Sequence, residues 1–252
     1  MAAMQRALLI TGASRGIGAA TARLAAERGW DVAVNYLRDA DAAAEVVEQV
    51  RARGRRAIAI QADQSVEADV LRLYAAVDRE FGATLGGLVN NAGIVDVAAR
   101  LQAMSAERMT RMFAVNAIGP MLCAREAVRR MSTGRGGAGG VIVNVSSAAA
   151  RGGGANQYVD YAASKGAIDT FTIGLAKEVA AEGIRVNAVR PGITDTEIHA
   201  SGGQPDRAWQ LAPQIPMQRP GTAEEIAHAI VWLLSDEASY TTGALLDVGG
   251  GR

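Results

Sequence analysis

The chain has 252 residues, of which 49% are hydrophobic and 21% are charged, a composition that supplies a large core and excludes an intrinsically disordered protein. Its 26 basic and 26 acidic residues cancel, so net charge gives no reason to expect nucleic acid or an anionic membrane as a partner. One cysteine, Cys123, cannot form a disulfide within the chain, and neither an apolar leader nor an apolar run of membrane-spanning length is present. We therefore expect one soluble, cytoplasmic domain, residues 1–252.

Apolar runs alternate with helical patterns along the sequence. The runs predict buried strands at residues 6–11, 31–36, 56–62, 87–90, 141–145, 184–189 and 244–248. The patterns predict helices at residues 16–28, 39–53, 66–81, 106–131, 158–181 and 222–234. This alternation indicates an α/β fold: a doubly wound, mostly parallel sheet of the Rossmann type, with helices on both faces and a ligand site at the carboxyl ends of the strands.

The first predicted strand ends in a glycine-rich turn, residues 11–18 (TGASRGIG). Such a turn before a helix presents backbone amides that can bind a pyrophosphate. It lacks the Gly-Lys-Ser/Thr ending of a nucleotide triphosphatase. Glycines also serve simply to turn a chain, but the position between a strand and a helix favours dinucleotide binding.

The second predicted strand ends at Asn35 and Tyr36, where an acidic residue would bind the ribose 2′-hydroxyl of NAD. A carboxylate there would repel the 2′-phosphate of NADP. Its absence, together with Arg15 and Arg38 nearby, favours NADP(H) over NAD. The alternative is that Arg38 only covers exposed surface.

Tyr161 and Lys165 (YAASK) lie four residues apart in the predicted helix 158–181 and so share one face. A tyrosine that transfers protons near neutrality needs its pKa of about 10 lowered by about three units, or ~4 kcal/mol. An ammonium about 4 Å away supplies ~4 kcal/mol at an effective dielectric constant of 20, although desolvation opposes it. The spacing suits general acid/base chemistry, and the alternative is an ordinary amphipathic helix.

Residues 194–219 contain two glycines and three prolines without strong periodicity, which predicts a mobile lid over the substrate. Residues 134–140 (GRGGAGG) predict a flexible connection. His199 and His228 are too isolated for a metal site, so we expect no bound metal, with a substrate contact as the alternative role of His199. We expect Cys123 to lie in the core.

Seven motifs in order carry a resemblance to a known family: residues 11–18, Asp63, Asn90-Asn91-Ala92-Gly93, Asn116, Ser146-Ser147, Tyr161 to Lys165, and Arg190-Pro191-Gly192. Over nearly the whole chain their order and spacing resemble the "classical" branch of the short-chain dehydrogenase/reductase family. Within it, the chain is similar to bacterial NADP-dependent reductases of the sugar-dehydrogenase and 3-oxoacyl-carrier-protein-reductase type. The resemblance implies hydride transfer between NADP(H) and a small-molecule carbonyl or alcohol substrate.

The resemblance also implies roles for matching residues. Tyr161 would be the general acid/base, Lys165 would lower its pKa and bind the nicotinamide ribose, and Ser147 would polarise the substrate oxygen. Asn116 would hold a water in the proton relay. The implied cofactor contacts are Gly12, Ser14, Arg15, Gly16, Ile17, Gly18, Asn35, Tyr36, Arg38, Asp63, Gln64, Asn90, Ala92, Gly93, Tyr161, Lys165, Pro191, Gly192, Ile193 and Thr194.

One spacing departs from the family pattern, because Ser147 lies 14 residues before Tyr161, one more than is usual. We expect residues 151–155 to absorb the extra residue, and Ser146 remains the alternative to Ser147.

The family further implies a homotetramer assembled through helices 106–131 and 158–181 and through the last helix and strand. Three other interpretations stay open. They are a non-catalytic NADP(H)-binding sensor or scaffold of the same fold, an epimerase or dehydratase of the extended branch, and an NAD-preferring dehydrogenase. A sensor has no need of the serine, tyrosine and lysine together, and the short chain without a large carboxyl-terminal substrate domain counts against the extended branch.

Overall fold

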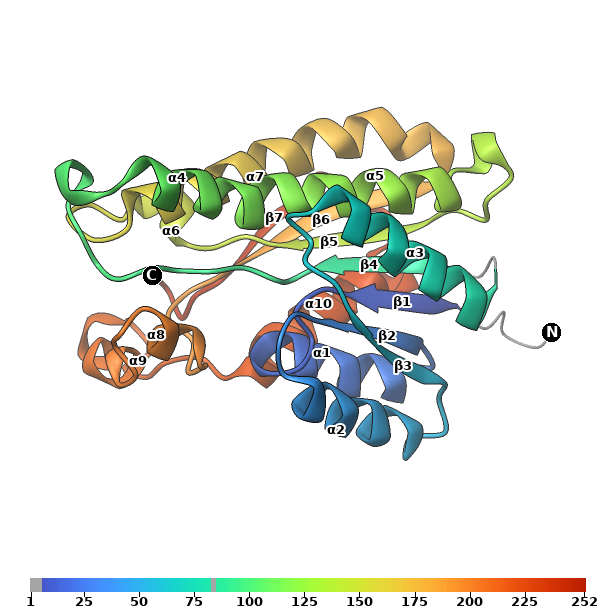
Figure 1. Ribbon diagram of the computed structural model, residues 1–252, viewed down its shortest axis with the longest axis horizontal. Coiled ribbons are helices and arrows are strands. Elements are labelled where there is room, and N and C mark those ends of the chain that lie inside the picture. The colour runs from blue at the N-terminus through green and yellow to red at the C-terminus, as the bar shows by residue number, and fades with distance from the viewer. Residues whose placement is uncertain (1–5, 83–84) are drawn as a thin grey trace.

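A seven-stranded parallel sheet forms the centre of the protein (Figure 1). The structure, a computed structural model, describes residues 6–82 and 85–252. The strands are β1 (Ala7–Ile10), β2 (Asp31–Tyr36), β3 (Ala57–Gln61), β4 (Leu85–Asn90), β5 (Gly140–Val145), β6 (Ile184–Pro191) and β7 (Leu245–Val248). They lie in the order β3-β2-β1-β4-β5-β6-β7. The predicted class, a doubly wound α/β fold of the Rossmann type, is confirmed.

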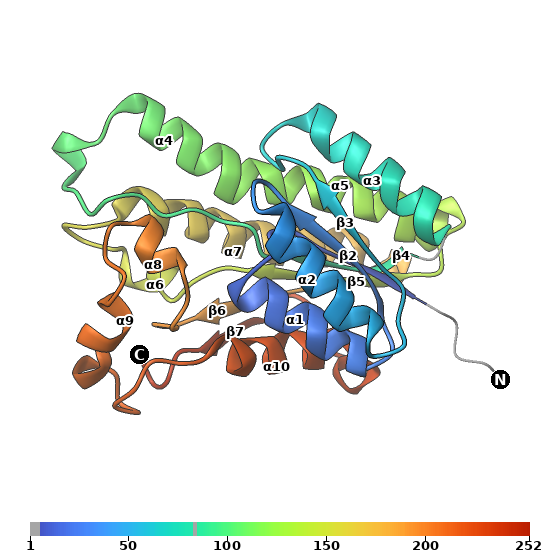
Figure 2. The same cartoon turned by 60° about the horizontal axis from the view of Figure 1, so that its bottom comes forward.

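Helices cover both faces of this sheet, as Figures 1 and 2 show. One face carries α1 (Gly16–Glu27), α2 (Ala40–Arg51) and α10 (Ala223–Leu234), and the other carries α3 (Glu67–Phe81), α5 (Gly119–Met131) and α7 (Val159–Val179). Each layer of helices encloses a hydrophobic core, the first core beneath α1, α2 and α10 and the second core beneath α3, α5 and α7. Along β1 the side chains alternate between them, with Leu8 and Ile10 in the first core and Ala7 and Leu9 in the second. Both faces of the strand are therefore buried, which explains why its sequence is apolar without alternation.

The predicted helix 106–131 is interrupted near its middle. It consists of α4 (Ala106–Phe113), a π-helical stretch at Ala114–Ile118, and α5. The buried amide of Asn116, inside the π-helical stretch, donates to the Ile94 carbonyl oxygen at 2.9 Å and accepts from the Ile94 N–H at 2.8 Å. The extra residue of the π turn accompanies this contact with the loop after β4.

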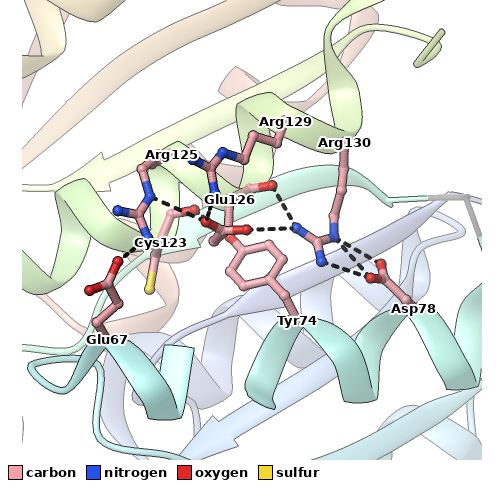
Figure 3. A network of polar contacts seen from close by, with 8 residues as sticks. All are labelled: Glu67, Tyr74, Asp78, Cys123, Arg125, Glu126, Arg129 and Arg130. Carbon is pink, nitrogen blue, oxygen red and sulfur yellow. Dashed lines mark hydrogen bonds and ion pairs between the residues drawn. The ribbon is translucent and has the colours of Figure 1, made fainter. Parts of the chain in front are cut away.

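A polar network joins α3 to α5 beside the second core (Figure 3). The Glu126 carboxylate, only 4% exposed, accepts hydrogen bonds from three arginines of α5: Arg125, Arg129 and Arg130. Arg130 also binds Asp78 of α3 at 2.8 Å, and the Tyr74 hydroxyl donates to the Cys123 carbonyl oxygen at 2.6 Å. The Cys123 thiol is fully buried, and burial raises its pKa to about 12. Cys123 is thus a core residue, as expected from the sequence.

The carboxyl ends of the strands meet along one edge of the sheet, and the chain reverses direction across the sheet between β1 and β4. This is the topological switch point at which doubly wound sheets bind ligands. Three short helices lie near this edge: α6 (Ala149–Gly152), α8 (Ile198–Ser201) and α9 (Arg207–Gln210). Thr222 and Glu225 form the predicted capping box of α10. Within the described ranges, no helix has both the length and the apolar character needed to cross a membrane.

Candidate active site

A cavity of about 1670 Å³ opens at the carboxyl edge of the sheet. It is bordered by the loops that follow β1, β2, β3, β4, β5 and β6 and by the 194–219 segment. Most of the residues predicted from the sequence to form the site line it: Gly12, Ser14, Arg15, Gly16, Ile17, Asn35, Tyr36, Arg38, Asp63, Gln64, Ala92, Gly93, Ser147, Tyr161, Lys165, Pro191, Gly192, Ile193 and Thr194.

Three predicted site residues lie behind the wall of the cavity instead: Gly18, Asn90 and Asn116. A Cβ on Gly18 would stand 2.6 Å from the Gly12 carbonyl oxygen, so Gly18 lets the turn pack against the first helix. The Asn90 amide donates to the Pro120 carbonyl oxygen at 3.0 Å and to Asn144 Oδ1 at 2.9 Å. Asn90 therefore ties β4 to α5 and β5, and its neighbour Asn91 lines the cavity.

The glycine-rich turn fits a pyrophosphate. Gly12 has a φ of +62°, and a Cβ there would stand 2.8 Å from the Ala92 Cα, so only glycine suits this position. Helix α1 begins after Arg15 without a side-chain cap or an acidic residue in its first turn. Its first N–H groups are therefore available to an anion, and the positive end of the helix dipole favours one.

The end of β2 holds this turn in place and carries positive charge. Asn35 Oδ1 accepts a hydrogen bond from the Gly12 N–H at 3.2 Å. Arg15 and Arg38 are exposed, line the cavity, and form no ion pair with the residues that the structure describes. The acidic residue that follows, Asp39, accepts from the Ala42 N–H as the N-cap of α2. Two guanidinium groups that form no ion pair within the described residues thus border the part of the cavity beside the glycine-rich turn, which the Glu197 carboxylate also approaches.

Helix α7 places Tyr161 and Lys165 together on the wall of the cavity. The Lys165 ammonium lies 5.8 Å from the centroid of the Tyr161 ring and donates to the Val145 carbonyl oxygen at 2.8 Å. Burial lowers the pKa of Lys165 to about 8, and the charge of Asp169 opposes this shift. Burial raises the pKa of Tyr161, and its hydrogen bond with the Ser147 side chain acts in the opposite direction. The expected lowering of the tyrosine pKa by the lysine is therefore not observed, because desolvation is the larger effect.

Of the two adjacent serines, the structure brings Ser147 to Tyr161. The Ser147 hydroxyl also accepts from the Ala149 N–H at 3.1 Å. Ser146 is buried, and its hydroxyl donates to the Lys165 carbonyl oxygen at 3.2 Å. Between Ser147 and Tyr161 the chain forms α6, followed by three residues with positive φ: Gly153, Gly154 and Asn156.

The Asn116 side chain is hydrogen-bonded to the loop after β4 and to α7. Besides its two hydrogen bonds with Ile94, its amide donates to the Ser164 hydroxyl at 3.2 Å, and that hydroxyl donates to the Tyr161 carbonyl oxygen at 2.7 Å. A Cβ on Gly93 would stand 3.3 Å from Asn116 Oδ1 and 3.4 Å from Lys165 Nζ. Asn116 thus holds the β4 loop and α7 in register next to the lysine.

Comparison with known proteins agrees with this geometry. The family model described as "Enoyl-(Acyl carrier protein) reductase" matches residues 12–252. The chain is 54% identical over 244 residues to the uncharacterized oxidoreductase YgfF of Escherichia coli, with 97% of this chain and 98% of the relative covered. The protein belongs to the classical short-chain dehydrogenase/reductase family.

Two further relatives of this short-chain dehydrogenase/reductase have more specific names. The chain is 41% identical to cis-4-hydroxycyclohexanecarboxylate dehydrogenase of Sinomonas cyclohexanicum, covering 98% of this chain and 96% of the relative. A short-chain dehydrogenase from Burkholderia cenocepacia, solved in complex with NADP, superposes with a TM-score of 0.88 at 35% identity, covering 98% of this chain and 97% of that one. This short-chain dehydrogenase/reductase is thus an oxidoreductase with an NADP-bound structural neighbour.

The 194–219 segment adds Arg207, which the sequence analysis did not single out, to this short-chain dehydrogenase/reductase site, and it places His199, the predicted alternative substrate contact, on the cavity wall. Arg207 of α9 lines the cavity and lies over the ring of Tyr158, 5.1 Å from its centroid. His199 also lines it, and its Nε2 lies 3.0 Å from the Thr194 carbonyl oxygen. Burial lowers the pKa of His199. No group of three or more metal-ligating side chains occurs in the described part of the chain.

Proposed function

We propose that this short-chain dehydrogenase/reductase transfers a hydride between NADP(H) and a carbonyl or alcohol carbon, with Tyr161 as the general acid/base. The observation that carries the proposal is the convergence of Tyr161, Ser147 and Lys165 on one wall of a cavity that also contains the glycine-rich turn. A dinucleotide spanning the cavity would have its pyrophosphate at that turn and its nicotinamide beside Tyr161. When bound, NADPH supplies the hydride.

The chain's own residues bind the substrate oxygen and transfer the proton. Ser147 and Tyr161 both line the cavity, and the Ser147 side chain lies close enough to influence the Tyr161 phenol, so both hydroxyls can donate to one carbonyl oxygen placed between them. Burial raises the pKa of Tyr161, which keeps the phenol protonated at neutral pH, the form that reduction requires. The charge of Lys165, which lies close to the ring, stabilises the tyrosinate left after the proton is transferred.

A substrate panel tests the reaction. Aldehydes, ketones, sugars and 3-oxoacyl thioesters are incubated with the enzyme while NADPH absorbance is followed. We expect oxidation of NADPH with at least one of these classes, and an alcohol as the product. Tight NADPH binding without turnover of any class would instead favour a sensor or scaffold.

We also propose a preference for NADP(H), supported by Arg15 and Arg38 and by the neighbour solved with NADP. In an Arg38→Asp variant, we expect NADPH affinity to fall by about 10- to 100-fold, because a charge-assisted contact with the 2′-phosphate is replaced by repulsion. NADH affinity should stay within about threefold, since NADH lacks that phosphate. Fluorescence titration of both reduced cofactors measures this difference.

The control is Arg28→Asp, which changes an exposed arginine at the end of α1 outside the cavity. It should leave both affinities unchanged. Equal affinities of the unmodified enzyme for NADH and NADPH would contradict the preference.

We propose a cytoplasmic homotetramer that uses α4, the π-helical stretch and α7 as one interface. Large apolar side chains are exposed there: Phe113 is 37% exposed, Ile118 50% and Ile173 38%. Exposed apolar patches of this kind commonly mark protein interfaces. Ile118→Glu should convert the tetramer into smaller species, as measured by light scattering after size exclusion, because it buries a charge at that interface.

Leu71→Glu, on the exposed part of α3, is the matched control and should keep the tetramer. A monomeric unmodified protein would contradict the assembly.

We further propose that residues 194–219, with α8 and α9, act as the substrate lid.

A further inference from the structure

Arg207 is a cation of the cavity whose charge no carboxylate balances. Its guanidinium donates to two neutral amide oxygens, Gln157 Oε1 at 2.9 Å and Gln204 Oε1 at 3.1 Å. It forms no ion pair with any residue within the described ranges. A guanidinium has five N–H donors, so these two contacts leave donors for a ligand.

The position of this charge is fixed next to the catalytic helix. Arg207 is half-buried and lies over the ring of Tyr158, 5.1 Å from its centroid. Tyr158 is the residue from which α7 begins, and Tyr161 stands in the first turn of that helix. The ring and the two amides immobilise the guanidinium, so little side-chain entropy is left to lose when a ligand binds.

Neighbouring arginines differ from Arg207 in their surroundings. Arg108 is paired with Asp160 at 2.8 Å, and Arg151 is paired with Asp247 at 3.1 Å. The cavity is also lined by Arg111, but that side chain is exposed to solvent, where its charge is screened.

The acidic side chains of the cavity that the structure describes form no ion pair with Arg207. Asp96 Oδ1 accepts from the Val97 N–H at 2.7 Å. Glu197 Oε2 lies at the glycine-rich turn, 3.4 Å from where a Cβ of Gly16 would stand. The charge of Arg207 reaches the cavity wall, since it helps to lower the pKa of His199. Asp195, whose carboxylate accepts from the Trp209 Nε1–H at 2.9 Å, acts on the His199 pKa in the opposite direction.

We propose that the substrate of this enzyme carries a carboxylate, which Arg207 binds while Tyr161 and Ser147 hold the reacting oxygen. A single unbalanced guanidinium matches a single negative charge, and its planar fork matches the two oxygens of a carboxylate. This inference rests on the proposed function, because it specifies the substrate class of the same site. The carboxylate itself is unchanged by the reaction, in which the carbonyl carbon gains the hydride and its oxygen gains the Tyr161 proton.

Matched substrates test this inference: 4-oxopentanoate against methyl 4-oxopentanoate, 4-oxocyclohexanecarboxylate against its methyl ester, and dihydroxyacetone phosphate against dihydroxyacetone. The enzyme should reduce at least one keto acid with a kcat/KM about 10-fold or more above that of its ester. Arg207→Gln should lower kcat/KM for that acid by about 10- to 100-fold, mainly through KM, and change the ester by less than about threefold. Arg207→Lys should recover part of the loss.

Arg111→Gln is the matched control, because it removes another arginine that lines the cavity and forms no ion pair within the described residues. This variant should keep the ratio of kcat/KM for the acid to kcat/KM for the ester. If Arg111→Gln lost this preference and Arg207→Gln kept it, the role of Arg207 would be overturned. Equal losses for acid and ester in Arg207→Gln would show a merely structural role. A preference for the phosphate over both acids would overturn the carboxylate assignment. If the enzyme reduces the esters as well as the acids, the carboxylate inference is wrong but the proposed function stands. If no substrate supports NADPH oxidation, the proposed function itself is wrong.

Discussion

Tyr161→Phe should reduce kcat by about 1000-fold or more while the affinity for NADPH stays within about threefold. Phenylalanine keeps the ring against α7 but removes the only proton that the phenol can give, and general acid catalysis contributes about 10²- to 10⁴-fold. The substrate oxygen also loses one of its two proposed hydrogen-bond donors, the Tyr161 hydroxyl, and keeps only Ser147. Single-turnover oxidation of NADPH measures the chemical step, and fluorescence titration measures binding.

The two adjacent serines provide the control for this experiment. Ser147→Ala should lower kcat by about 100-fold, the size of effect seen when one oxyanion donor is removed. Ser146→Ala removes a hydroxyl that donates to the Lys165 carbonyl oxygen and should change kcat by only a few-fold. Near-normal turnover in Tyr161→Phe would mean that the proton comes from another group. Equal losses in the two serine variants would mean that Ser147 does not contact the substrate oxygen.

Lys165→Met should change the pH dependence of stability. Burial lowers the pKa of Lys165 from 10.5 to about 8, so the folded state binds its proton less tightly than the unfolded state does. Below pH 8 the lysine is charged in both states, and burial destabilises the fold in full. As the pH rises from 8 to 10.5, this penalty disappears. Relative to Lys165→Met, the unmodified protein should therefore gain about 3 kcal/mol of unfolding free energy across that interval.

Urea unfolding of both proteins at a series of pH values measures this gain. The variant also loses the hydrogen bond to the Val145 carbonyl oxygen, so the change of the stability difference with pH, and not its absolute size, is the quantity compared. Lys177→Met, on an exposed part of the same helix, is the matched control. The difference in unfolding free energy between this variant and the unmodified protein should change far less with pH. A constant difference between the unmodified protein and Lys165→Met would show that the ammonium is well solvated. The activity of Lys165→Met should be low at every pH, because nothing replaces the charge beside Tyr161.

The sequence predicted the sheet well because most strands are buried on both faces and read as apolar runs. β1 and β5 are examples, with side chains that enter both cores. The glycine-rich turn and the Tyr161 to Lys165 spacing were visible for a similar reason, since each depends on residues close together in the chain. The structure places both on the wall of one cavity.

What the sequence did not predict depends on contacts between distant segments. Arg207 meets Tyr158 and Gln157 only after the chain has passed through β6 and the 194–219 segment. Asn90 was expected at the cofactor but lies behind the cavity wall, because Asn144 of the adjacent strand accepts its amide hydrogen. The direction of the Tyr161 pKa shift was missed because burial cannot be read from helical spacing.

The π-helical stretch at residues 114–118 limits where a residue can be deleted from this protein without damage to the site. A residue removed there would restore an ordinary helix and rotate α4 by about 100° relative to α5. Arg108 would then turn away from Asp160, to which it now binds at 2.8 Å, and Asn116 would leave Ile94. A deletion at this point would thus disrupt the cavity wall that carries Tyr161 and Lys165. The inserted residue is one that selection for turnover should retain.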